Sequence, residues 1–249
     1  MKTNISSRKG FSLVEVVIAI GIVAVLLTTF MAVFGPAQKS INRALGVADA
    51  NRLVATLENE MAILRPGEET DYDSSSFEKA FQWIRESPTE TSAIVVYQYQ
   101  ALPSAQNADG TLQAADIILV NDNLNFPGVD YITQTVARRL DKTSSASFLT
   151  AELSPGIVQG KVYAVRMTQL IQDSGGTGLI LGNPGEIKYL DNGNLEDASD
   201  SSQYKEGYIT LQVEFFALNN NLHAYVTGGA WEFDKLGTPV ATQNIAVRR

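Results

Sequence analysis

The stretch Lys9-Gly10-Phe11-Ser12-Leu13-Val14-Glu15, with the apolar run behind it, decides how this chain is organised. Between Phe11 and Phe34, Glu15 is the only residue that carries a formal charge. As a helix, this run would be about 36 Å long at ~1.5 Å per residue, which is enough to cross a bilayer. The sequence therefore predicts a transmembrane helix over residues 11–34.

A short basic segment, residues 1–10, precedes the apolar run and ends with Arg8 and Lys9 before its final glycine. Positive charge ahead of an apolar run holds that end in the cytoplasm. A secretory signal peptide with a cut near Gly35-Pro36-Ala37 would share this layout, and so would a plain membrane anchor. Neither explains Glu15, because a carboxylate in the membrane interior costs roughly 2.5–3.5 kcal/mol on insertion scales and needs a partner.

The segment from Gly10 to Glu15 resembles the type IV prepilin processing motif. In that motif a basic leader ends in glycine, a methylatable aromatic residue follows, and glutamate stands at the fifth position of the mature chain. The resemblance implies that a prepilin peptidase cuts between Gly10 and Phe11 and methylates the new amine of Phe11. It also implies that Glu15 meets the Phe11 amine of a neighbouring subunit in a filament, since a buried carboxylate is tolerated beside an opposite charge.

The composition describes an acidic chain without cysteine. Its 249 residues allow one or two domains, and its formal net charge is −8 at pH 7. An acidic surface argues against unaided nucleic-acid binding, although Arg138-Arg139 and Arg248-Arg249 could each form a local basic patch. The absence of cysteine excludes disulfides, thiolate metal sites and a cysteine nucleophile. An exported domain must then rely on its apolar core, for which 45% hydrophobic residues suffice.

The long helix is expected to continue beyond the membrane over residues 35–66. Gly35-Pro36 should interrupt or kink it, because proline lacks an N–H and clashes with the preceding turn. Apolar residues then recur at steps of three and four, which indicates one helix face packed on a globular domain, and Arg65-Pro66-Gly67 ends the helix. The residues of this stripe are Val47, Ala50, Val54, Leu57, Met61 and Leu64.

Residues 67–249 are expected to form an α+β head in which this helix packs on an antiparallel β-sheet, which is also the architecture of pilins. A short helix is predicted at Phe77–Glu86, with Ser75 and Glu78 at the spacing of a capping box. Tyr131–Leu140 fits either a strand or a helix. The predicted strands are 93–102, 116–120, 161–171, 207–218 and 222–233.

Around the later strands, the pattern predicts one hairpin and two loops. Asn219-Asn220-Asn221 is expected to join the last two strands, because asparagine tolerates left-handed conformations. The loop 173–185 is rich in glycine, and the loop 191–207 is acidic. The tail after Asp234 either folds over the sheet or hangs loose.

The acidic loop holds the candidate metal ligands. Calcium takes several oxygen ligands, which clustered carboxylates could supply, and some pseudopilins carry calcium in a C-terminal loop. The spacing is not that of an EF-hand, and a solvated loop is the competing interpretation. We therefore expect no cofactor. If this loop does bind a metal ion, calcium is the candidate. Its candidate ligands are Asp191, Asn194, Glu196 and Asp197.

Three other features have simple structural explanations. His223 is the only histidine, so a serine triad or a histidine-based metal site would have to use it, whereas a sheet-surface role needs nothing more. The segment 175–178 is rich in glycine but lacks the Walker lysine, which favours a plain loop. Either an aromatic binding surface or ordinary sheet packing would account for Tyr97, Tyr99, Trp231 and Phe233.

The leading hypothesis is a structural protein and not an enzyme: a subunit of a type IV pilus-like or type II secretion pseudopilus filament, whose length favours a minor subunit. The resemblance implies that prepilin peptidase, other pilin or pseudopilin subunits and the bacterial inner membrane are its partners. It further implies a single pass, a cytoplasmic leader, a periplasmic head and a place in a surface filament. No nucleic-acid partner is expected. The alternatives are a periplasmic or surface binding or enzymatic domain on a non-assembling anchor, and a monomeric envelope protein with an uncleaved anchor.

Overall fold

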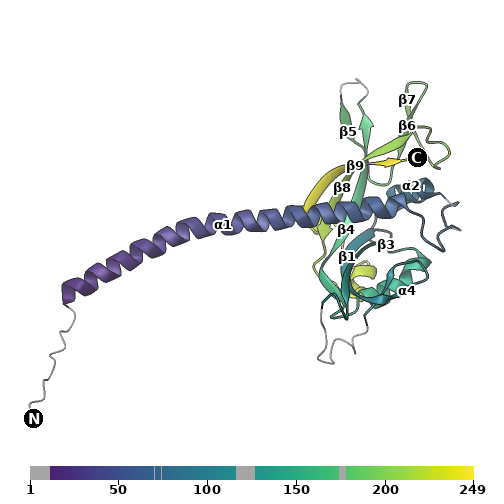
Figure 1. Cartoon of the computed structure of the whole chain (residues 1–249). Coiled ribbons are helices and arrows are strands. Elements are labelled where there is room, and N and C mark those ends of the chain that lie inside the picture. Colours follow the sequence, from purple (N-terminus) through teal and green to yellow (C-terminus); the bar gives the residue numbers. More distant parts are fainter. Residues whose placement is uncertain (1–11, 70, 74, 116–126, 174–177) are drawn as a thin grey trace, which may run out of the picture. The chain divides into compact units, whose positions relative to one another are not determined.

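The computed structural model describes residues 12–69, 71–73, 75–115, 127–173 and 178–249, apart from the side chains of residues 33, 35–48, 143 and 144. The chain forms two compact units, Met1–Ala48 and Asp49–Arg249. Helix α1 (Leu13–Ala62) runs from the first unit into the second, which also holds the whole β-rich head (Figure 1).

Helix α1 passes through Gly35-Pro36 without a break, so the predicted interruption is wrong. Proline removes only its own N–H from the hydrogen-bond ladder, and the bonds of the neighbouring turns maintain the helix. The segment Leu13–Ala32 has the length and apolar composition of a membrane span, and none of it is buried. At its other end α1 stops at Ala62, ahead of the turn at Pro66-Gly67, as predicted.

The head is built on an antiparallel sheet, which confirms the predicted α+β class. The strands follow the order β2-β1-β4-β8-β9; β3 also pairs with β1, and β5 with β4. A separate hairpin consists of β6 (Lys188–Asp191) and β7 (Asn194–Asp197), and β7 lies within the segment 191–207 that was predicted to be a loop. The sheet strands are β1 (Ile94–Gln106), β2 (Leu112–Ala114), β3 (Ile132–Arg139), β4 (Val158–Gln172), β5 (Leu179–Leu181), β8 (Tyr208–Ala217) and β9 (Ala241–Arg248).

One face of the sheet is covered by the end of α1 and by helix α2 (Ser76–Glu86). Within the head, the predicted stripe on α1 is buried at Val54, Leu57 and Met61, because these side chains pack against the sheet. Ser75 caps α2 as predicted and accepts a hydrogen bond from the Glu78 N–H at 3.4 Å. The Glu78 carboxylate accepts from Gln82 instead of returning to Ser75, and the reciprocal half of the box is not seen.

The other face of the sheet is covered by α4 (Thr143–Glu152), α5 (His223–Thr227) and the short 3-10 helix η1 (Phe233–Lys235). Side chains of a strand alternate between the two faces, so β1 sends Ile94 and Val96 into the first core and Val95 and Tyr97 into the second. Strand β1 is thus buried on both sides along its first half. Helix α4 was not predicted, since its serines and alanines give no strong apolar periodicity.

The predicted strand Leu222–Phe233 and its Asn219-Asn220-Asn221 hairpin are wrong. The segment instead forms α5, a turn and the beginning of η1. Gly229 has a φ of 64° in that turn, and Trp231 Nε1 donates to the Val226 carbonyl at 3.1 Å, so the segment folds back on itself. Its apolar residues cover the second core and alternate with polar ones along the chain. This alternation is the same pattern that a strand would show.

The C-terminal tail supplies the strand that this segment does not. Strand β9 pairs with β8 from Tyr208↔Arg248 to Phe215↔Ala241. Tyr131–Leu140, which the pattern left open, is strand β3 because it pairs with β1 along its whole length. The predicted strand over residues 116–120 lies outside the described residues.

Candidate membrane anchor and assembly site

Glu15 lies in the first turn of α1, and its side chain is exposed. Its backbone N–H donates to Ser12 Oγ at 3.2 Å, and the Val16 N–H donates to the Ser12 carbonyl at 3.2 Å. Ser12 therefore caps the helix and determines where it begins. A carboxylate in the first turn also faces the positive end of the helix dipole. One anionic group thus stands at the start of an apolar span.

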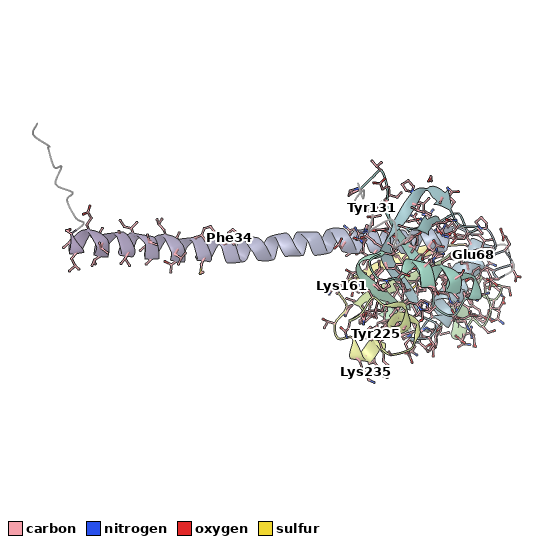
Figure 2. All side chains as sticks on the ribbon, turned by 90° about the horizontal axis from the view of Figure 1, so that it is seen from below. Phe34, Glu68, Tyr131, Lys161, Tyr225 and Lys235 are labelled. Carbon is pink, nitrogen blue, oxygen red and sulfur yellow. The ribbon has the colours of Figure 1, made fainter. Side chains whose placement is uncertain are left out.

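The side chains of Leu13–Ala32 point outward around the whole helix (Figure 2). The hydroxyls of Thr28 and Thr29 donate to carbonyls one turn earlier, at 2.6 and 2.8 Å. These polar groups are therefore satisfied within the helix, as an apolar environment requires. Glu15 is the one charged group that this span offers to its surroundings.

The other residues of the predicted processing site are Arg8, Lys9, Gly10 and Phe11, and all four lie outside the described residues. Cleavage after Gly10, methylation of Phe11 and the leader charges therefore stay predictions, as does the role of Glu15 in assembly. Of the predicted site, the structure describes only Glu15, which is the first charged residue of helix α1.

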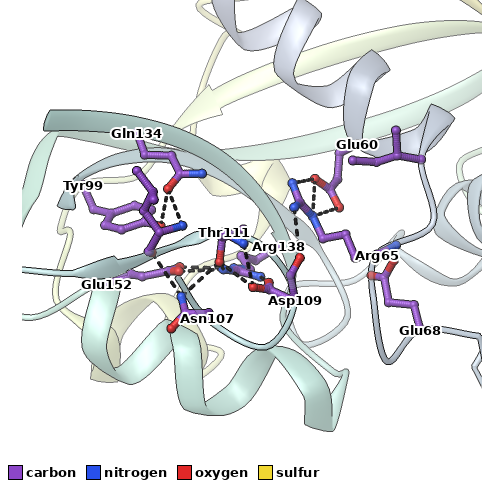
Figure 3. Close-up of polar contacts among 12 residues, drawn as sticks. Glu60, Arg65, Glu68, Tyr99, Asn107, Asp109, Thr111, Gln134, Arg138 and Glu152 are labelled. Carbon is purple, nitrogen blue, oxygen red and sulfur yellow. Dashed lines mark hydrogen bonds and ion pairs between the residues drawn. The ribbon is translucent and has the colours of Figure 1, made fainter. Parts of the chain in front are cut away.

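A buried charge cluster joins the end of α1 to α2. Lys79 Nζ lies 2.8 Å from both Glu60 Oε1 and Glu68 Oε2, and it donates to the Ile63 carbonyl at 3.2 Å. Arg65 donates to both carboxylate oxygens of Glu60, at 2.8 and 2.6 Å (Figure 3). Burial alone would raise the pKa of Glu60, but the Arg65 hydrogen bond and the Lys79 charge hold it below its ordinary value. We call this group the Lys79 cluster.

A second buried group, the Arg138 cluster, ties α4 and the 107–111 turn to the sheet (Figure 3). Arg138 lies 2.6 Å from Asp109 Oδ2 and 2.6 Å from Glu152 Oε1, and the Tyr97 hydroxyl donates to Glu152. Burial opposes ionisation of Asp109, but hydrogen bonds from Arg138 and Thr111 lower its pKa. The sequence alone marks Arg138 only by its charge, because its acidic partners are distant in the chain.

Arg138-Arg139 does not form a basic surface patch. Arg138 is 5% exposed and Arg139 is 1% exposed. Arg139 binds Glu86 and Asp141 at 3.1 and 2.5 Å. Both guanidinium groups are thus neutralised inside the head and are not available to phosphates.

The candidate calcium ligands lie on the β6–β7 hairpin and do not converge. Asp191 pairs with Asn194 across the hairpin, Glu196 faces Tyr189, and Asp197 lies 3.7 Å from Arg85. Because neighbouring side chains on a strand point to opposite faces, Asp197 lies on the other face of the hairpin from Glu196 and is paired with Arg85 instead. Within the described part of the chain, no group of three or more histidine, aspartate or glutamate side chains could hold a metal ion.

The remaining candidates are His223, the glycine-rich segment and the aromatic residues. The sheet-surface place expected for His223 is wrong, because this residue begins helix α5, where its Nε2 lies 3.4 Å from Thr150 Oγ1. Residues 175–177 of the glycine-rich segment lie outside the described residues. The packing interpretation of the aromatic residues is confirmed, since all of them are buried in the second core: Tyr97, Tyr99, Trp231 and Phe233.

These features fit a protein with a single-pass N-terminal membrane anchor and an α+β head. Residues 5–31 match the family model described as the prokaryotic N-terminal methylation motif. The match confirms the resemblance to type IV prepilins, whose motif marks substrates of prepilin peptidase and suggests a structural subunit. No curated protein and no solved structure matches the chain.

Proposed function

We propose that this chain is a structural subunit of a type IV pilus-like or type II secretion pseudopilus filament, polymerised through its N-terminal helix. The observation that carries the proposal is the methylation-motif match over residues 5–31, which overlaps the exposed apolar span Leu13–Ala32, whose one charge is Glu15. A plain anchor has no use for a carboxylate near the start of its span, where the charge is costly. A filament supplies the missing partner.

Processing would create that partner. Prepilin peptidase cuts between Gly10 and Phe11 and methylates the Phe11 amine, while Arg8 and Lys9 keep the leader cytoplasmic. The charged amine of one subunit then pairs with Glu15 of its neighbour, in a setting where each charge offsets the desolvation of the other. In the inner membrane the head would lie on the periplasmic side.

The head contributes stability that does not depend on the membrane. Asp49–Arg249 holds two apolar cores, one on each face of the sheet, and the Lys79 cluster joins the end of α1 to α2. A subunit that leaves the membrane for a filament needs a head that stays folded, and this one contains no cysteine to help it. The length of the chain favours a minor subunit.

Mass spectrometry of the mature N-terminus from native membranes tests the proposal. We expect a chain that starts at Phe11 and carries one added methyl group. A matched variant, Gly10→Leu, places a bulky side chain where the peptidase must approach the backbone, and this variant should start at Met1. A wild-type chain that starts at Met1 would indicate a plain anchor, and one that starts near Gln38 an ordinary signal peptide; either result would overturn the proposal.

A further inference from the structure

Strands β4 and β8 separate from each other at one end of the sheet. Their ladder runs as far as the pair Gln169↔Leu211. Beyond that pair, β4 continues to Gln172, and among the described strands it pairs there only with β5. The beginning of β8, from Tyr208, pairs only with β9 among the same strands. The two strand ends therefore leave a gap between them.

The backbone of β4 faces this gap at Gln172. On the β5 side, the Gln169 carbonyl accepts from the Gly182 N–H at 2.9 Å. Backbone groups alternate between the two sides of a strand, so those of Leu170 and Gln172 point toward β8. The Thr210 hydroxyl donates to the Leu170 carbonyl at 2.8 Å, whereas no described strand pairs with Gln172 on this side. A free edge of this kind accepts an extended chain.

A cavity of about 420 Å³ lies in the gap, since residues of both strand ends line it. Its walls are held by hydrogen bonds within the head. The Gln169 amide donates to the Lys188 carbonyl at 2.8 Å and accepts from the Lys188 N–H at 2.6 Å. The Tyr204 hydroxyl donates to the Tyr208 carbonyl at 3.0 Å. Both Gln169 and Tyr204 are buried, so these bonds fix the shape of the cavity.

One charged group in the lining has no counter-ion. Lys188 Nζ lies 3.3 Å from Glu186 Oε2, so this ammonium group is already paired. Glu206 also lines the cavity, and it is exposed. Its carboxylate lies 3.2 Å from the Tyr204 hydroxyl but forms no ion pair with any described residue. The cavity thus presents one uncompensated negative charge.

Apolar side chains complete the lining. Leu190 and Leu195 lie opposite each other on the β6–β7 hairpin, and Leu179 is on the neighbouring strand β5 (Figure 1). The three leucines are between 40% and 58% exposed. Arginine and lysine place an aliphatic stem on apolar surface and a charged head on a polar group. The leucines and Glu206 offer these two environments side by side in one cavity.

We propose that the gap binds an extended segment of a partner protein that carries an arginine or lysine side chain. The segment pairs with the free edge at Gln172. The stem of its basic side chain lies against Leu190 and Leu195, and the charged head meets Glu206. An apolar or acidic segment would cover Glu206 without supplying a counter-charge, which is costly. The inference goes beyond the proposed filament function, because it assigns a partner to the head and does not depend on assembly.

Binding of short peptides to the full-length chain in a deuterated non-ionic detergent tests the site. The probe is the peptide acetyl-Gly-Val-Arg-Val-Gly-amide, and matched probes carry citrulline or glutamate in place of arginine. Citrulline keeps the shape of arginine and lacks its charge. Saturation-transfer NMR, with the peptide in excess, gives the dissociation constant of each peptide.

We expect the arginine peptide to bind with a dissociation constant on the order of 1 mM, which is ordinary for so small a ligand. The citrulline peptide should bind about fivefold more weakly, and the glutamate peptide more weakly still. Glu206→Gln should weaken binding of the arginine peptide by the same factor of about five, because it removes the other charge of the pair. It should leave the citrulline peptide unaffected, since that peptide has no charge to lose.

Glu232→Gln is the control variant, because it removes the same charge just ahead of η1 and away from the cavity. It should change none of the dissociation constants. An arginine peptide that binds the Glu206→Gln chain as tightly as the unsubstituted chain would overturn the site, and so would equal binding of the three peptides. Absence of binding by any peptide at about 5 mM would overturn it as well. None of these results alters the N-terminal processing test, so the site and the filament function can fail separately.

Discussion

The ammonium nitrogen of Lys79 lies 2.8 Å from Glu60 Oε1, although the Lys79 side chain is fully buried. Glu60 is in the last turn of α1 and Lys79 is in α2, so this ion pair connects the long helix to the first helix of the head. The buried ammonium is tolerated because Glu60, Glu68 and the Ile63 carbonyl receive its three N–H groups. Its removal would leave Glu60 with Arg65 as its remaining counter-charge.

Lys79→Met should destabilise the folded head by about 3 kcal/mol, since it leaves the buried Glu60 with only part of its compensation. The free energy of unfolding would be measured by urea titration of the full chain in detergent, followed by circular dichroism. Lys235→Met is the matched control, because its ion pair with Glu232 is exposed and its loss should have no measurable effect. Equal stability of the two variants would show that the Lys79 cluster does not hold α1.

Two of the buried carboxylates in the clusters, Glu60 and Asp109, predict acid sensitivity. The pKa values of Glu60 and Asp109 lie below their ordinary values of 4.5 and 3.8. A lowered folded-state pKa contributes stability that is present above the unfolded-state value and is lost as the pH falls through the folded-state value. The free energy of unfolding should therefore change little through these groups between pH 7 and about pH 5, and should fall below that.

Asp109→Asn should make the free energy of unfolding fall less at acid pH. It should also lower the free energy of unfolding at neutral pH. The measurement is the urea midpoint between pH 2.5 and 7, with Asp234→Asn as control because that carboxylate is 94% exposed. If the pH profile of Asp109→Asn ran parallel to that of the unsubstituted chain, Asp109 would not be a source of the acid sensitivity.

Tyr97→Phe should destabilise the head by about 1–3 kcal/mol, because it removes a hydrogen bond to the buried Glu152 carboxylate. Burial, and then the negative charge of Glu152, raise the pKa of Tyr97 well above 10.0, so the hydroxyl keeps its proton in the folded protein. Thermal unfolding of the full chain tests this, with Tyr208→Phe as the exposed control. An equal loss in both variants would argue against a special role for the Tyr97 hydroxyl.

Glu15→Ala should leave cleavage after Gly10 intact and lower incorporation into filaments by on the order of tenfold or more, since the Phe11 amine loses its counter-charge. Cleavage is read from the mature N-terminus, and incorporation from the amount of chain in sheared filaments. Thr28→Ala is the control within the same span, because the Thr28 hydroxyl bonds only within its own helix. Normal incorporation of Glu15→Ala would remove the proposed role.

The sequence predicted α1 and α2 well because helix signals are local. The period of Val54, Leu57 and Met61 depends on the geometry of one helix, and the Ser75 cap acts across only three residues. The same local reasoning went wrong at Gly35-Pro36, where proline predicts a break but the neighbouring turns continue the helix. It also went wrong at 222–233, where apolar alternation serves a cap over the second core.

The sequence by itself determined the apolar span, its single charge at Glu15 and the methylation motif, because these depend on the order of residues along one segment. Only the tertiary structure decided that β9 and not 222–233 joins β8, and that Lys79 and Arg138 lie inside the head. The physical reason is that strand pairing and the burial of a charge depend on partners far away in the chain. Arg138 is stable in the interior only because folding brings Asp109 and Glu152 to it.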